Sequence, residues 1–165
     1  MAADMPLGQG PYLVAACLCE RVLDEKDGVK SAIRFVDRIT RTMVGPSPAK
    51  EMEPFEYPLT LLIKLKSGWA RGAYDLQIRL VKPSGESPTP FQRTIYLEGE
   101  EDRSTDVVVN MRMKFDTPGV HWFDVYLGEL CMTRIPLRIV YIPQVRQVRR
   151  PGEGQPPDQL PPAGA

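Results

Sequence analysis

The sequence predicts an all-β protein, an antiparallel β-sandwich of about eight strands. Apolar side chains recur at every second position in segment after segment, which is the period of a strand with one buried face. Turn residues separate these segments, and the 165-residue chain contains 17 Pro and 13 Gly. No stretch longer than about two turns shows the spacing of an amphipathic helix, so folds of alternating strands and helices are excluded.

The expected strands follow one another at the spacing typical of sandwiches. The first is an apolar run from Tyr12 to Glu20, and Asp27-Gly28 after it favours a hairpin turn because both residues tolerate positive φ. A single next strand is expected to carry on one face Val29, Ser31, Ile33, Phe35, Asp37 and Ile39. A proline-rich loop covers 45–58, and further strands are expected at 59–66, 74–80, 91–97, 107–115, 120–127 and 130–142.

Composition divides the chain into three parts. Residues 1–10 are expected to be a flexible N-terminus, and residues 11–142 carry all the strand signals of one sandwich domain. Residues 143–165 consist mainly of Pro, Gly, Gln and Arg. Such a segment cannot bury enough apolar surface to offset its ordering entropy, so a disordered tail is expected there.

Charge and cysteine content indicate the class of partner and the compartment. The 21 basic and 21 acidic side chains cancel, which disfavours a surface that tracks nucleic-acid phosphates. No apolar run approaches the roughly 18 residues of a membrane span, so no membrane partner is expected. Cys17, Cys19 and Cys131 are odd in number and occur outside a disulfide-dense scaffold. We therefore expect reduced thiols and a cytoplasmic protein.

Motifs for catalysis and cofactor binding are missing from the sequence. It contains no Gly-x-Ser-x-Gly elbow, no His-Glu-x-x-His and no phosphate-binding glycine loop, so no catalytic residue and no cofactor is expected. His121 is the sole imidazole, so any Ser-His or Cys-His mechanism would have to use it, with an Asp such as Asp37 or Asp124 as its partner. Asp124 lies three positions after His121 and hence on the opposite face of a strand.

One acidic loop invites a calcium hypothesis, because hard cations prefer oxygen ligands. Its carboxylates are Glu98, Glu100, Glu101, Asp102 and Asp106. Arg103 lies among them, and the run lacks the alternating spacing of calcium ligands. A solvated loop is expected instead, and no metal site.

Four residues are candidates for binding: Asp37, Trp69, His121 and Trp122. Asp37 interrupts an apolar strand face, and an unpaired buried carboxylate is costly. Either the strand bends after Phe35 and turns Asp37 outward, or Asp37 pairs with a neighbour, or it faces a ligand. Aromatic rings can stack on sugars or pack in the core, and the aromatic set considered is Trp69, Tyr74, Trp122 and Tyr126. His121 is expected to be a half-exposed strand residue with a backbone partner, with a catalytic or ligating role as the alternative.

Two stretches resemble a known family. They are Cys19-Glu20-Arg21-Val22 through Asp27-Gly28 into Ile33–Ile39, and Pro118–Leu130 with Thr133-Arg134-Ile135-Pro136-Leu137. They resemble the opening and closing hairpins of a family of small bacterial β-sandwich proteins of unknown function. The second stretch is also similar to the last hairpin of immunoglobulin-like domains. The resemblance spans most of 11–142 and implies an immunoglobulin-like sandwich in a bacterial cytoplasm, without any activity or functional residues to transfer.

These observations favour a non-enzymatic protein-interaction module that binds another protein. The alternative is a small-ligand or carbohydrate-binding sandwich that uses the aromatic side chains. An enzyme centred on His121 is the third hypothesis. Homo-oligomerisation through an edge strand stays open as well.

Overall fold

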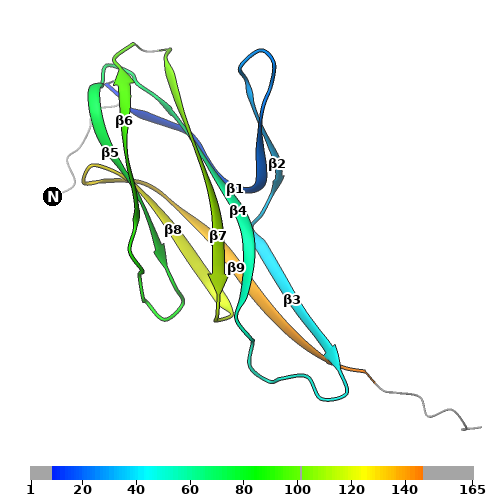
Figure 1. Cartoon of the computed structure of the whole chain (residues 1–165). Helices are drawn as coiled ribbons and strands as arrows, with labels where there is room; N and C mark the ends of the chain where they lie inside the picture. The colour runs from blue at the N-terminus through cyan, green and yellow to red at the C-terminus, as the bar shows by residue number, and fades with distance from the viewer. Residues whose placement is uncertain (1–8, 101, 147–165) are drawn as a thin grey trace, which may run out of the picture.

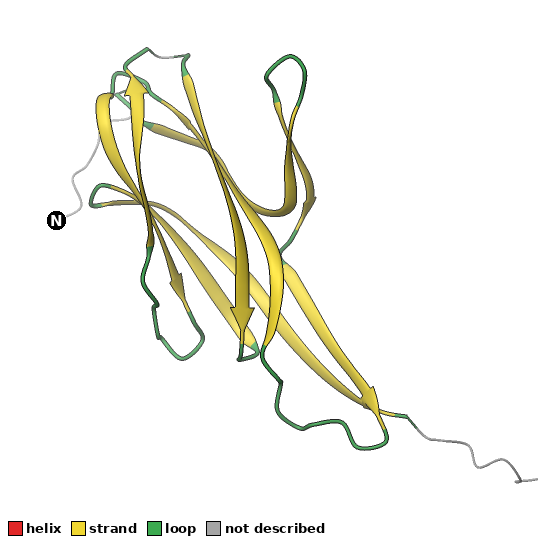
Figure 2. Ribbon diagram, in the orientation of Figure 1, coloured by secondary structure: helices red, strands yellow, loops and turns green. Residues whose placement is uncertain are grey.

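The computed structural model describes residues 9–100 and 102–146, and these residues form nine strands in two sheets (Figures 1 and 2). No helix occurs among them, so nothing in the described part is a helix that could cross a membrane. The strands are β1 Tyr12–Asp24, β2 Lys30–Phe35, β3 Arg38–Gly45, β4 Phe55–Lys66, β5 Arg71–Val81, β6 Phe91–Glu98, β7 Ser104–Phe115, β8 Gly119–Leu127 and β9 Leu130–Val145. The all-β prediction is confirmed.

The strand order is that of an immunoglobulin-like sandwich. One sheet has the order β2-β1-β4-β7 and the other the order β3-β9-β8-β5-β6. Neighbouring strands are antiparallel except β3 and β9, which are parallel. Strands β1, β4 and β7 thus face β9, β8, β5 and β6, the arrangement of the two sheets in immunoglobulin domains.

The core lies between the sheets and follows from the alternation in the sequence. Alternate residues of β4 (Leu59, Leu61, Ile63 and Leu65) are at most 1% exposed. From the other sheet Phe123, Val125 and Leu137 are equally buried. Because each strand contributes every second side chain to the same apolar layer, a shift of register by one residue would expose a whole row.

The strand expected over Val29 to Ile39 is wrong as a single element. It is divided into β2, which pairs with β1, and β3, which pairs with β9 in the other sheet. The chain crosses between the sheets at Val36 and Asp37. Phe35 is consequently 71% exposed, whereas Ile39 is 7% exposed and belongs to the core. The division raises the number of strands from the expected eight to nine.

Strand β1 changes its partner along its length. Residues from Tyr12 to Cys19 pair with β4, and residues from Cys19 to Asp24 pair with β2. The end of the β1–β2 hairpin therefore extends away from the body of the sandwich (Figure 1). The predicted Asp27-Gly28 turn joins its two strands, with Gly28 at a φ of 81°. An ion pair between Asp24 and Lys30 ties the end of the hairpin.

Strand β9 is longer than expected. It continues to Val145, so residues 143–145, assigned to the tail from composition, belong to a strand that pairs with β3. Backbone pairing with β3 supplies these three residues with a partner that composition does not reveal. The rest of the expected tail, 147–165, and most of the expected flexible N-terminus, 1–8, lie outside the described residues.

Candidate functional site

His121 points into the core, so the expectation of a half-exposed strand residue is wrong. It lies in β8 with Phe123 and Val125 on the inner face, and its side chain is 1% exposed. The edge of its ring meets Phe115, with centroids 5.2 Å apart and planes at 83°. Asp124, on the outer face of the same strand, cannot reach it, as the alternation of strand residues requires.

The imidazole of His121 is poorly suited to proton transfer. Neither ring nitrogen has a hydrogen-bond partner among the described residues. Burial lowers the pKa of His121, and the neighbouring backbone of Gly119 and the charge of Asp116 offset this effect only in part. The ring is therefore neutral at physiological pH and has no access to a substrate.

Asp37 lies in the crossover between β2 and β3 and is exposed. Of the three alternatives, the end of the strand after Phe35 explains its outward position. Its carbonyl oxygen accepts a hydrogen bond of 2.9 Å from the backbone N–H of Arg138. Asp37 lines a cavity of about 270 Å³ on the outer face of the five-stranded sheet, together with Arg38, Val120, Pro136 and Arg138.

Trp69 lies far from His121. Trp69 is 65% exposed in the turn that follows β4, where its backbone N–H donates a hydrogen bond to the backbone carbonyl of Gln9 at 2.9 Å. His121 packs on Phe115, which contacts Phe55 at the other end of β4. A strand of the length of β4, 12 residues, spans roughly 35 Å. The two predicted candidates therefore belong to different ends of the sandwich.

Trp122 is half-buried on the outer face of β8 and is part of a charged cluster. The guanidinium of Arg134 lies 5.0 Å from the centroid of its ring. The same guanidinium donates from Nε to Oδ1 of Asp124 at 2.8 Å. Asp124 is 7% exposed, although it points outward. Arg134 thus joins a nearly buried carboxylate and an aromatic ring on the outer face of the sheet.

Tyr126 extends this cluster along β8. The guanidinium of Arg79, from β5, lies 4.4 Å from the centroid of the Tyr126 ring. Its Nε also donates to Oε1 of Gln77 at 2.6 Å. Arg79, Asp124 and Arg134 are directly opposite one another in the register of three adjacent strands. We call the set Arg79, Trp122, Asp124, Tyr126 and Arg134 the guanidinium–aromatic layer.

The four aromatic residues considered from the sequence do not gather into one platform. Tyr74 packs against the core, and Trp69 lies in its separate turn. The rings of Trp122 and Tyr126 each carry a guanidinium. The faces on which a sugar ring would stack are therefore partly occupied by the protein's own side chains.

The acidic loop contains its own cation, the side chain of Arg103. Arg103 makes ion pairs with Glu98 at 3.4 Å and with Glu100 at 3.0 Å. Asp106 pairs with Lys64 at 2.9 Å. Glu101 lies outside the described residues. These pairs engage three of the described carboxylates, Glu98, Glu100 and Asp106.

The three cysteines are free thiols and belong to different surroundings. Cys17 and Cys19 lie on β1, and Cys131 lies exposed on β9 in the other sheet. Burial raises the pKa of the Cys17 thiol, with a smaller contribution from Cys19, and burial likewise raises the pKa of Cys19. The two thiols are therefore weak nucleophiles at neutral pH.

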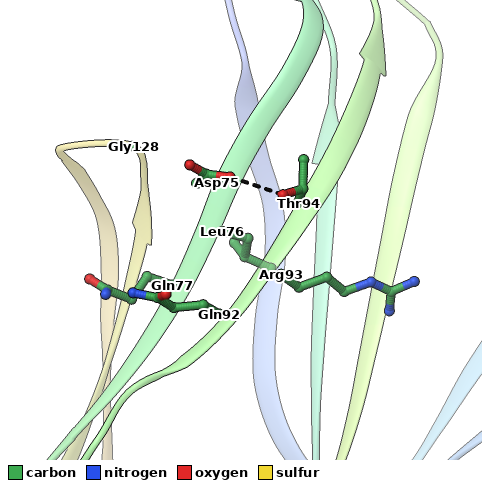
Figure 3. Close-up of a pocket in the computed structure, with 7 residues that line it drawn as sticks. All are labelled: Asp75, Leu76, Gln77, Gln92, Arg93, Thr94 and Gly128. Carbon is green, nitrogen blue, oxygen red and sulfur yellow. Dashed lines mark hydrogen bonds between the residues drawn. The ribbon is translucent and has the colours of Figure 1, made fainter.

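A larger cavity of about 410 Å³ lies along β5 and β6 (Figure 3). Its polar lining includes Asp75, which accepts a hydrogen bond of 3.0 Å from Thr94, and the amides of Gln77 and Gln92, which lie side by side in Figure 3. Arg93 points away from this group.

The sequence interpretation did not connect the arginines on the outer face of the five-stranded sheet with the aromatic residues. Arg79, Arg134 and Arg138 each occupy outward positions that alternation alone predicts. Their significance depends on which strands are neighbours, because the ring under Arg79 is on β8 and not on its own strand. An arginine and an aromatic residue at outward positions of adjacent strands would have been the signal.

Residues 14–140 match the profile of a family of unknown function, DUF6941. No curated protein matches the chain. Among solved structures, an immunoglobulin-like protein from Pseudomonas aeruginosa is 10% identical, with 80% of this chain and 98% of that chain covered and a TM-score of 0.39. A β-glucosidase from Listeria innocua, solved with glucose, is 13% identical over 86% of this chain and 19% of that chain, with a TM-score of 0.37.

Proposed function

This chain belongs to the family of unknown function DUF6941, and we propose that it is a non-enzymatic protein-interaction module. Its partner binds the outer face of the five-stranded sheet, centred on the guanidinium–aromatic layer. The observation that carries the proposal is the stacking of Arg134 on Trp122 and of Arg79 on Tyr126 around the nearly buried Asp124. We also propose a cytoplasmic location, which the three free thiols support.

The composition of the layer supports binding to a protein. Trp, Tyr and Arg are the residue types most enriched at the energetic centres of protein interfaces, where they bury large areas at low entropic cost. The internal stacking holds these side chains in place before a partner arrives. Preorganisation of this kind reduces the ordering entropy that association would otherwise cost.

No described feature favours the carbohydrate alternative over this proposal. A sugar site needs an open aromatic face, and the rings of Trp122 and Tyr126 carry guanidinium groups. Trp69 is well exposed, but it lies in a turn away from both rings. A glycan array separates the two functions, since only a sugar binder gives saturable signals there.

The test uses the full chain as bait in extract from its native source, with captured proteins quantified by mass spectrometry. The variant Trp122→Ser/Tyr126→Ser removes both rings of the layer. The matched control Tyr12→Ser/Phe35→Ser removes two exposed rings from the four-stranded sheet. A stoichiometric partner that is lost with the first variant and retained with the control supports the proposal. Equal capture by both variants, each still folded by circular dichroism, contradicts it.

A further inference from the structure

We propose that Arg38 and Arg138 form an anion-binding pocket that receives an acidic side chain of the protein partner. The pocket is the cavity of about 270 Å³ that these two arginines line with Asp37, Val120 and Pro136. The identity of the ligand rests on the proposed function, because the pocket adjoins the guanidinium–aromatic layer. Pro136, in its lining, is directly opposite Trp122 in the register of β8 and β9.

The strand register places the two arginines side by side. Arg38 and Arg138 are directly opposite partners at the start of the parallel β3–β9 pair. Both side chains point outward, because Leu137, Ile139 and Ile39 fill the core from the alternating positions. Neighbouring strands lie about 4.8 Å apart, so the two side chains leave the backbone close together, and both line the same cavity.

No carboxylate neutralises this pair. Among the described residues neither Arg38 nor Arg138 makes an ion pair, whereas Arg34, Arg103, Arg112 and Arg134 each do. Like charges directly opposite each other in a sheet are destabilising. Asp37 lines the same cavity but does not approach either guanidinium to within ion-pair distance, 4.0 Å. The pocket therefore retains a net positive charge.

A carboxylate fits this arrangement chemically. The guanidinium is a planar fork whose N–H groups match the two oxygens of a carboxylate, and two such forks can share one anion. Val120 and Pro136 provide apolar walls against which the methylene groups of a Glu side chain can pack. The outer face of the sheet thus combines the aromatic rings of the guanidinium–aromatic layer with a positively charged pocket next to it.

The probe is a hexaglutamate peptide, titrated into the full chain carrying Trp69→Phe. The chain has two tryptophans, so this variant leaves Trp122, beside the pocket, as the fluorescent reporter. We expect a saturable change in fluorescence that weakens as salt is added. The variant Arg38→Gln/Arg138→Gln should bind at least about tenfold more weakly. The variant Asp37→Asn should bind about two- to threefold more tightly, since it removes the competing charge.

The matched control is Arg21→Gln/Arg93→Gln, which removes the same charge from exposed arginines elsewhere on the sandwich. Affinity within about twofold of the parent supports a specific pocket. An equal loss in both double variants would show that the peptide senses only overall charge and would overturn the inference. So would saturation by inorganic phosphate at concentrations where hexaglutamate does not bind.

The hexaglutamate titration and the test of the proposed function can fail independently of each other. Should the Trp122→Ser/Tyr126→Ser variant lose the captured partner while hexaglutamate fails to bind, the pocket assignment is wrong and the docking face stands. Should hexaglutamate bind through both arginines while the partner is retained by that variant, the docking face is wrong and the pocket is an independent anion site.

Discussion

Arg134 of β9 and Asp124 of β8 are directly opposite each other on the outside of the sandwich and share a hydrogen bond of 2.8 Å. The side chain of Asp124 is 9% exposed although it lies on the outer face, and the same guanidinium lies over the Trp122 ring. This contact raises the pKa of Arg134, chiefly through the hydrogen bond to Asp124. The acidic partner of this ion pair is thus shielded from water, while the side chain of Arg134 stays 53% exposed.

The first prediction concerns that pair. Arg134→Ala should lower the melting temperature, because it leaves a nearly buried carboxylate without its partner. Asp124→Asn in the Arg134→Ala background should recover part of the loss, since the amide needs less compensation than the charge. Differential scanning calorimetry of the two single variants and the double variant measures the coupling. Additive effects of the two changes would show that the contact contributes nothing.

The second prediction concerns the pH dependence of stability. Burial lowers the pKa of His121 in the folded protein below its ordinary value of 6.5. The unfolded chain therefore binds a proton more readily, and the free energy of unfolding falls as the pH drops below that ordinary value. One proton limits the slope to about 1.4 kcal/mol per pH unit. Above pH 6.5 this contribution is constant.

His121→Leu should remove this slope and raise the free energy of unfolding at neutral pH by about 1 kcal/mol, because it replaces two unpaired buried nitrogens with apolar surface. Asp116, whose charge acts on His121, has its pKa lowered by its hydrogen bond to Lys82, so its stabilising contribution disappears only at more acidic pH. Urea titrations between pH 5 and 8 test whether the contribution of His121 is lost at a higher pH than that of Asp116. An unchanged slope in His121→Leu would contradict the burial of a neutral imidazole.

The third prediction tests the division of the strand between β2 and β3. Ile39→Ala should cost about 2–3 kcal/mol, because Ile39 is packed in the core. Phe35→Ala should cost less than about 0.5 kcal/mol, because its ring is mostly exposed. Both residues lie on one face if the strand is continuous, and both substitutions would then be costly. Chemical denaturation of the two variants distinguishes the cases.

The local pattern of the sequence was sufficient for the architecture and insufficient for the crossover. The alternation of Leu59, Leu61 and Ile63 identifies a strand and its buried face because those three side chains fill the core. The same alternation continues from Ile33 through Phe35 to Ile39 although the chain changes sheets at Asp37. The two-residue period does not reveal this change of sheet, because the chain is extended both before and after it.

The candidate site was predictable only in part, for a related reason. The outward positions of Trp122 and Tyr126 follow from their places in one strand. Their stacking with Arg134 and Arg79 depends on which strands lie next to β8. Sheet order is set by the packing of the whole core, so pairs between strands do not follow from periodicity within each strand.

The most direct test of the docking face is hydroxyl-radical footprinting of the full chain, alone and in complex with its captured partner. Oxidation of Trp122 and Tyr126 should fall several-fold in the complex, while that of Trp69 and Phe35, both well exposed, should stay the same. Protection of Phe35 or Trp69 with Trp122 and Tyr126 unchanged would place the partner elsewhere on the molecule and contradict the proposed function.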